Sequence, residues 1–81
     1  MDIQDRREVI REIQSFLLDI SYRIPSFPHI TIDGIYGKET EDAVRYFQEL
    51  YELPVTGIVD FLTLLLLFDV YSDTEENANG E

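Results

Sequence analysis

The side chains that could do chemistry in this chain are one histidine and many carboxylates. A nucleophilic mechanism needs a nucleophile beside a base. His29 could act as the base, but the chain has no cysteine and no serine motif that would supply the nucleophile. No pair of His or Cys ligands occurs at a spacing that suits zinc. A glycosidase with paired carboxylates needs a long sugar cleft, which so short a chain cannot build. We therefore expect no catalytic centre, no metal and no cofactor, and we do not expect an enzyme.

The carboxylates have a simpler role in the predicted structure. Asp33, Glu39, Glu41 and Asp42 gather where a helix is expected to begin. There they complement the positive end of the helix dipole. This cluster is therefore interpreted as support for a helix start.

Length and charge narrow the class of protein further. Eighty-one residues form one domain. A formal charge of −11 repels polyanions, which argues against nucleic acid and anionic membranes as partners. The simpler explanation of the acidity is that it only maintains solubility.

No apolar run reaches the roughly 18 residues of a membrane-spanning helix. The start of the chain has no apolar segment typical of a signal peptide, so the cytoplasm and export by a non-classical route both stay open.

Three segments have the apolar periodicity of helices: residues 5–20, 38–52 and 60–70. Pro54 is expected to follow the end of the second helix, and Asp60 to cap the start of the third. The apolar positions of the first two helices are Val9, Ile13, Phe16, Leu17 and Ile20, then Ala43, Val44, Phe47, Leu50 and Tyr51.

The remaining segments are predicted to be irregular. Residues 21–37 contain Pro25 and Pro28 and are expected to form a loop. Beyond Ser72 the sequence has almost nothing apolar to bury and is predicted to be disordered. The expected organisation is an all-α, compact three-helix bundle over residues 1–71, followed by a disordered acidic tail over residues 72–81.

The chain also contains an internal repeat. The segment from Asp33 to Thr40 reappears 23 residues later as the segment from Thr56 to Thr63. In this register Gly34 matches Gly57, and Val44 matches Leu67. Each copy has a glycine that suits a positive φ, then an aliphatic residue, and then a helix with a threonine in its first turn. The same device is therefore expected to start two helices.

These segments resemble a known family, the peptidoglycan-binding domains of the three-helix type. Residues 32–48 resemble its signature D-G-x-[FY]-G-x-x-T-x-x-A-[VL]-x-x-[FY]-Q. Residues 53–60 are similar to the segment L-x-V-T-G-x-[VL]-D that leads into its last helix, and residues 9–22 are similar to its first helix. Two places depart from the pattern: Ile20-Ser21-Tyr22 replaces Leu-Gly-Tyr, and Leu64 follows Thr63 where the family has tryptophan.

The resemblance implies a non-catalytic module from a bacterium or phage that binds peptidoglycan or muropeptide at the cell wall. Aromatic faces can stack on sugar rings, and Arg45 can bind a stem-peptide carboxylate. The candidate ligand-binding residues are Tyr22, Asp33, Tyr36, Arg45 and Tyr46. The alternative is that the tyrosines only edge the core. Gln14 and Gln48 are expected to hydrogen-bond the loops from the helix flanks.

The third helix favours a different function. It is apolar almost all round, and a three-helix domain can cover only one side of such a helix. By register with the second helix, Leu64, Leu67 and Phe68 are expected to face the core. Leu62, Leu65 and Leu66 would then form an interface with a protein partner or with another copy of the chain. The alternative function is therefore a protein-interaction or assembly module on the same fold.

Overall fold

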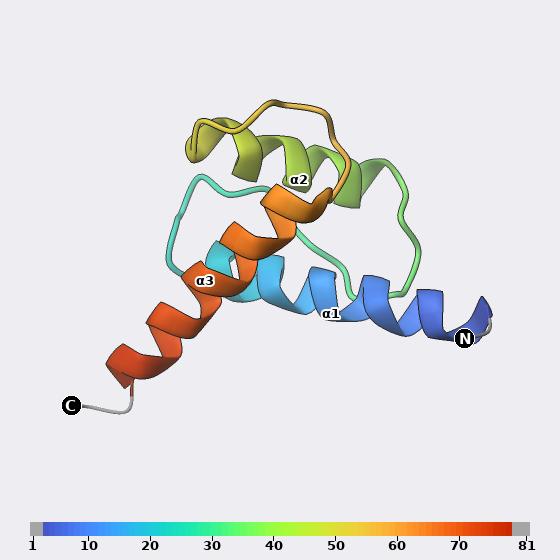
Figure 1. Cartoon of the computed structure of the whole chain (residues 1–81), viewed down its shortest axis with the longest axis horizontal. Helices are drawn as coiled ribbons and strands as arrows, with labels where there is room; N and C mark the ends of the chain where they lie inside the picture. The colour runs from blue at the N-terminus through green and yellow to red at the C-terminus, as the bar shows by residue number, and fades with distance from the viewer. Residues whose placement is uncertain (1–2, 79–81) are drawn as a thin grey trace.

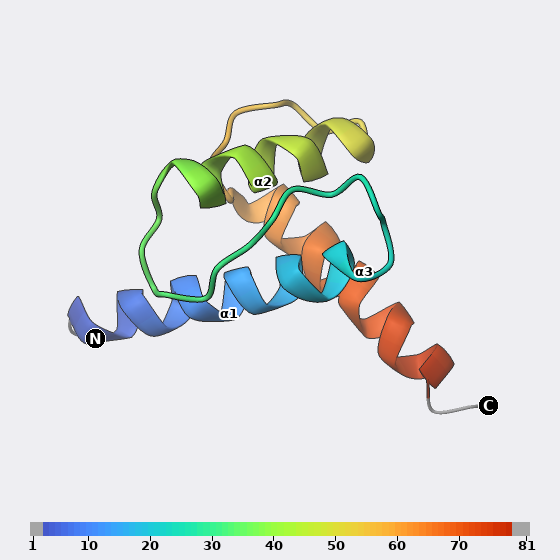
Figure 2. The same cartoon turned by 180° about the vertical axis from the view of Figure 1, so that it is seen from behind.

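The computed structural model describes residues 3–78, with side chains for residues 6–70, and contains three helices: α1 (Ile3–Ser21), α2 (Lys38–Leu50) and α3 (Phe61–Ala78). Figure 1 shows α1 and α2 one above the other and running in the same direction, with α3 crossing them diagonally. The connections 22–37 and 51–60 therefore both return along the molecule, as Figure 2 also shows from behind. The described residues contain no strand, which confirms the predicted all-α three-helix fold.

The core forms where the predicted apolar faces of the helices meet. Six of the predicted positions on α1 and α2 are buried, and they pack with Leu67 of α3. Phe47 and Leu17 are the largest of the fully buried side chains. The buried residues of α1 and α2 from the predicted faces are Ile13, Leu17, Ile20, Ala43, Val44 and Phe47. Burial of Leu67 confirms the register between the second and third helices, in which it matches Val44.

The connection between α1 and α2 also supplies part of the core. Phe27 and Ile30 are buried, although both lie in the segment predicted only as a loop. The turn that begins this connection is closed by a backbone hydrogen bond of 2.9 Å from Phe27 N–H to the Ile24 carbonyl. The connection is therefore packed against the helices as a structural layer.

Gln14 fixes this connection to α1. Its Oε1 accepts hydrogen bonds from the backbone N–H groups of Asp33, at 3.0 Å, and Gly34, at 2.9 Å. Its Nε2 contacts the Asp33 carboxylate, the Ile35 carbonyl and the Thr40 hydroxyl at 2.9–3.1 Å. Because Gln14 is fully buried, these bonds replace those that water would otherwise make.

Gln48 makes the same set of contacts to the connection between α2 and α3. Its Oε1 accepts from the backbone N–H groups of Thr56, at 2.9 Å, and Gly57, at 3.0 Å. Its Nε2 contacts the Thr56 hydroxyl, the Ile58 carbonyl and the Thr63 hydroxyl at 3.0–3.2 Å. The expectation that both glutamines hydrogen-bond loops is confirmed, and so is the internal repeat.

The two glycines of the repeat have nearly identical conformations. Gly34 has φ 77° and Gly57 has φ 78°, in the left-handed region that glycine adopts without strain. Each turn lies against the helix that carries its glutamine. A β-carbon on Gly34 would lie 2.5 Å from Arg7 Cγ, and one on Gly57 would lie 2.8 Å from Arg45 Nε. Both positions therefore favour glycine for its conformation, and a β-carbon there would also displace an arginine side chain.

The helix ends differ from the prediction by more than one residue in three places. α1 begins at Ile3 and not at residue 5, and α2 ends at Leu50 and not at residue 52. Glu52 has a left-handed φ of 61°, and Leu53 N–H bonds the Gln48 carbonyl at 2.8 Å, which closes the end of α2. The third difference is the length of α3, which continues to Ala78.

The extent of α3 corrects part of the predicted tail. Residues 72–78 were expected to be disordered, but their backbone is helical. No glycine or proline interrupts the sequence between Gly57 and Gly80, and Glu and Ala are good helix formers, so an existing helix can continue. The rest of the predicted tail, residues 79–81, lies outside the described part of the chain.

Some predicted core positions are exposed. Val9 and Leu50 lie at the edge of their apolar stripes and are 55% and 44% exposed. On α3, Leu64 is 40% exposed and Phe68 is 56% exposed, so the prediction that both face the core with Leu67 is wrong. The crossing of α3 over the other two helices buries only a narrow strip of its surface, centred on Thr63 and Leu67.

Candidate functional site

Tyr46 lies in a surface hollow on the second half of α2. The hollow has a volume of about 320 Å³ and is lined by Tyr46, Glu49 and Leu50. The Tyr46 and Phe27 rings pack in a T-shaped arrangement, with the ring centres 5.2 Å apart and the planes at 73°. The Tyr46 hydroxyl is hydrogen-bonded to the Ser26 hydroxyl. The connection 22–37 therefore fixes the orientation of the tyrosine beside the hollow.

The hollow combines groups suited to a polar ligand that has apolar faces. Leu50 is partly exposed and supplies an aliphatic wall, and the exposed Glu49 supplies a carboxylate that accepts hydrogen bonds. Tyr46 supplies an aromatic surface. The three residues occupy positions i, i+3 and i+4 of one helix, so they share one face. That spacing is visible in the sequence, but assigning Leu50 to the core hid it.

Tyr36 and Arg45 meet elsewhere, around the turn at Gly57. The Tyr36 hydroxyl donates a hydrogen bond of 2.6 Å to the Gly57 carbonyl. Arg45 forms an ion pair with Glu41 at 2.8 Å, and both side chains lie close to the place a β-carbon of Gly57 would occupy. Burial, followed by the nearby Glu41 carboxylate, raises the pKa of the Tyr36 phenol to about 12. The contacts of both residues therefore support the turn, in addition to any role in binding.

The contacts of Asp33 also support a turn. Its carboxylate accepts a hydrogen bond of 3.0 Å from the Ile35 N–H and one of 3.0 Å from Gln14 Nε2. These two donors, the backbone N–H first, lower the pKa of the carboxyl below its ordinary value. Asp33 is exposed but engaged in these bonds.

Tyr22 lies just beyond the end of α1 and is 76% exposed. Of the five predicted ligand-binding residues, Tyr46 lines the hollow on α2. Tyr36 and Arg45 lie together at the Gly57 turn, and Asp33 lies at the Gly34 turn. The structure therefore distributes the predicted residues over several places and does not gather them into one site.

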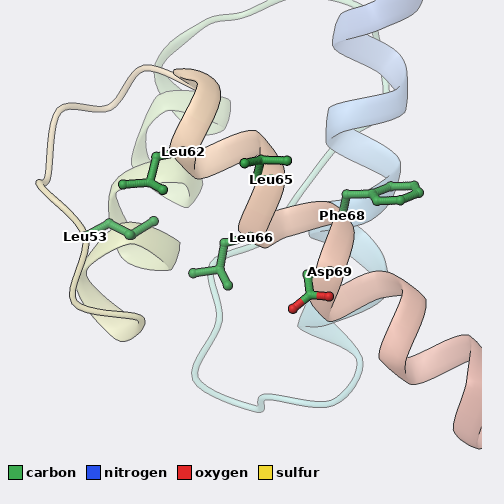
Figure 3. Close-up of a pocket in the computed structure, with 6 residues that line it drawn as sticks. All are labelled: Leu53, Leu62, Leu65, Leu66, Phe68 and Asp69. Atoms are coloured by element: carbon green, nitrogen blue, oxygen red, sulfur yellow. The ribbon is translucent and has the colours of Figure 1, made fainter.

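A second concave surface, the α3 groove, lies along the third helix. It has a volume of about 530 Å³ and is lined by Leu53, Leu62, Leu65, Leu66, Phe68 and Asp69. Figure 3 shows Leu62 and Leu66 projecting from α3 toward Leu53, whereas Phe68 projects to the other side. There the Phe68 ring packs against the Phe16 ring of α1 in a T-shaped arrangement, with ring centres 6.3 Å apart.

The α3 groove contains all three residues predicted for an interface. Leu62 and Leu65 are 53% and 51% exposed, and Leu66 is partly buried against the core. The contributions of Leu53, Phe68 and Asp69 to this surface were not predicted from the sequence. Phe68 had been assigned to the core, and no local pattern relates Leu53 to a helix that begins eight residues later.

No group of three or more His, Cys, Asp or Glu side chains among the described residues is placed to hold a metal ion. No described helix combines the length and the apolarity needed to cross a membrane.

Comparison with known proteins gives one match. The model of the family described as "Putative peptidoglycan binding domain" matches residues 6–67, which is about three quarters of the chain. No curated protein and no solved structure matches the chain significantly. The matched range includes both glutamines, both glycine turns and the hollow at Tyr46.

Proposed function

Because the chain belongs to the peptidoglycan-binding domain family, we propose that it binds the bacterial cell wall without catalysing a reaction on it, through the hollow at Tyr46. The observation that carries this proposal is the side-chain composition of that hollow. An aromatic ring, an aliphatic side chain and one carboxylate line a volume of about 320 Å³ on a single face of α2. The expected location of the protein, in this proposal, is at the cell wall.

The chemistry of the glycan suits these groups. A pyranose ring has an apolar C–H face that can pack on Tyr46 and Leu50, and its hydroxyl and acetamido N–H groups can donate to Glu49. Hydrolysis of a glycosidic bond normally uses a pair of carboxylates that flank the bond. The hollow presents one carboxylate, which supports binding without hydrolysis.

The charge distribution favours the glycan over the stem peptide as the main contact. The chain has a net charge of −11, which disfavours a stem-peptide carboxylate. Arg45, the cation predicted to bind such a carboxylate, is already paired with Glu41 at 2.8 Å. A stem peptide that bound there would have to displace Glu41.

The test is a titration with soluble muropeptide, followed by NMR, together with co-sedimentation on insoluble peptidoglycan. We expect the amide signals of Tyr46, Glu49 and Leu50 to move. Leu50→Ala removes apolar contact from the hollow and should weaken binding roughly fivefold. Leu62→Ala is the matched control, since Leu62 is a similarly exposed leucine outside the hollow, and it should leave the affinity unchanged. If millimolar muropeptide moves no amide signal, the proposal is wrong.

A second candidate function is assembly with another protein through α3. The observation that favours it is the α3 groove, which exposes several large apolar side chains at the surface of a small domain. This function is compatible with wall binding, because the groove and the hollow at Tyr46 share no residue.

A further inference from the structure

The lining of the α3 groove indicates the shape of its occupant. Five of its six lining residues are apolar, and the sixth is Asp69. An extended peptide needs partners for its backbone N–H and C=O groups, and a strand edge is what usually supplies them. The described residues offer no strand edge, whereas a helix satisfies its own backbone groups. The groove is therefore suited to the apolar face of a helix.

The length of the groove sets the length of the contact. Leu62 to Asp69 spans eight residues of α3, which is about 10 Å or two helical turns. A partner helix that packs along it can insert apolar side chains at positions i, i+3, i+4 and i+7. Leu53 borders one side of this contact and Phe68 the other (Figure 3).

Charge selects among the helices that could occupy the groove. Residues 46–81 contain eight acids and no Lys or Arg, so every basic residue of the chain lies before Tyr46. Asp69 lines the groove itself, and the exposed Glu52 precedes Leu53. A second copy docking through the same face would bring its own Asp69 and Glu52 toward these two carboxylates, with a repulsive result. A helix with Lys or Arg beside its apolar face would be attracted.

We propose that the α3 groove binds a basic amphipathic helix of a protein partner. This inference rests on the second candidate function, assembly through α3, and is independent of wall binding. It assigns Leu62, Leu65 and Leu66 to the apolar floor of the contact and Asp69 to its acidic rim.

The probe is a synthetic peptide of about 14 residues with leucine at helical spacing and lysine at the other positions. The full chain is titrated with it and followed by NMR. We expect the amide signals of Leu53 and of residues 62–69 to move, with an affinity that falls about tenfold between 20 and 200 mM salt. A peptide with glutamate in place of every lysine should move none of them.

Paired variants test the position of the contact. Leu65→Lys places a cation on the groove floor and should weaken binding of the lysine peptide at least tenfold, an expected effect of about 1.4 kcal/mol. Leu64→Lys makes the same change one residue earlier, outside the groove, and should leave the affinity within about twofold. Asp69→Lys, at an exposed position where folding is not at risk, should weaken binding, whereas Glu8→Lys on α1 should not.

Four outcomes would overturn the inference. Equal binding of the glutamate peptide would show that charge does not select the partner, and signals that move only outside the groove would show a different site. Self-association in sedimentation equilibrium that Leu65→Lys abolishes would identify a second copy as the occupant, and would leave the assembly function standing. If neither peptide moves a groove signal and the protein stays monomeric at high micromolar concentration, both the inference and the assembly function are wrong. The muropeptide titration is unaffected by any of these results.

Discussion

At the scale of single residues, two glutamines connect the irregular segments of this small domain to its helices. Gln14 and Gln48 are fully buried, and each accepts two backbone N–H groups from a glycine turn. The described residues contain no buried side-chain polar atom without a partner. A buried amide is costly unless it is fully hydrogen-bonded, so the turn and the glutamine stabilise each other. Each glutamine is separated in sequence from the turn that it holds: Gln14 binds the turn at Gly34, and Gln48 binds the turn at Gly57.

The glycine of each turn gives the first residue-scale prediction. Gly57→Ala should destabilise the fold by roughly 1–3 kcal/mol, because a side chain at positive φ is strained. Its β-carbon would also lie 2.8 Å from Arg45 Nε and 3.0 Å from Glu41 Cγ. Thermal or urea unfolding, followed by circular dichroism, measures the loss.

Gly37→Ala is the matched control for this prediction. Gly37 has φ −103°, and the nearest atom to an added β-carbon is 3.9 Å away. We expect a change below about 1 kcal/mol at this helix-capping position. Equal losses for the two variants would show that positive φ at Gly57 does not determine the turn.

At the scale of the helices, α2 and α3 begin in different ways. α2 begins after Gly37, which makes no side-chain capping bond, while Glu39 and Glu41 lie in its first turn. α3 begins after Asp60, whose Oδ1 accepts the Thr63 N–H at 2.9 Å, which confirms the predicted cap. The start of α3 therefore depends on the ionisation of one carboxylate more directly than the start of α2 does.

The Asp60 cap predicts a pH dependence of stability. The Thr63 N–H, followed by the Thr63 hydroxyl, lowers the pKa of Asp60 below its unfolded value of about 3.9. A lowered pKa means that this contribution to stability is complete above about pH 4 and is lost as the pH falls through the folded-state pKa. Asp33, whose pKa is lowered too, acts in the same window.

The measurement is the melting temperature of wild type and Asp60→Asn between pH 2 and pH 7. Asparagine keeps an acceptor but cannot be protonated there, so the decrease below pH 4 should be smaller in the variant. Asp69→Asn changes an exposed carboxylate that caps no helix and should follow the wild-type curve. A variant curve parallel to wild type at every pH would exclude the Asp60 carboxylate as a source of the acid sensitivity.

At the scale of the whole molecule, charge opposes folding. The chain carries a net charge of −11 within a radius of gyration of 12.6 Å. The described residues form two ion pairs, Lys38 with Asp42 and Arg45 with Glu41, and both are largely exposed. Exposed pairs of this kind contribute little, so repulsion among the surplus acids is the larger electrostatic effect.

Screening of this repulsion gives the whole-molecule prediction. The Debye length falls from about 30 Å at 0.01 M salt to about 10 Å at 0.1 M. It therefore falls from well above the 12.6 Å radius of gyration of the domain to below it. The melting temperature should therefore rise by several degrees when NaCl is added from 10 to 300 mM. Calorimetry at neutral pH measures this rise in melting temperature. Replacing NaCl by tetramethylammonium chloride controls for specific binding of sodium. A melting temperature that falls with salt would mean that the two ion pairs outweigh the repulsion.

The sequence by itself determined the features that depend on local chemistry. Helical periodicity located all three helices, because an amphipathic helix repeats its apolar face about every 3.6 residues. Gly34 and Gly57 marked the two turns, because positive φ strongly favours glycine, and both glutamines were expected to hydrogen-bond loops. Tyr46 was identified as a candidate for binding, although Glu49 and Leu50 beside it were not.

Only the tertiary structure decided which apolar residues face outward. Residues 61–70 of α3 are apolar almost all round, so their sequence has no preferred face. The angle at which α3 crosses α1 and α2 selects Leu67 for the core and leaves Leu64 and Phe68 exposed. The same packing buries Phe27 and Ile30 from a segment that has no periodicity at all. It also places Leu53 beside Leu62 and Leu66, and so forms the α3 groove. Burial at these positions depends on contacts between distant segments, and a local pattern carries no information about those contacts.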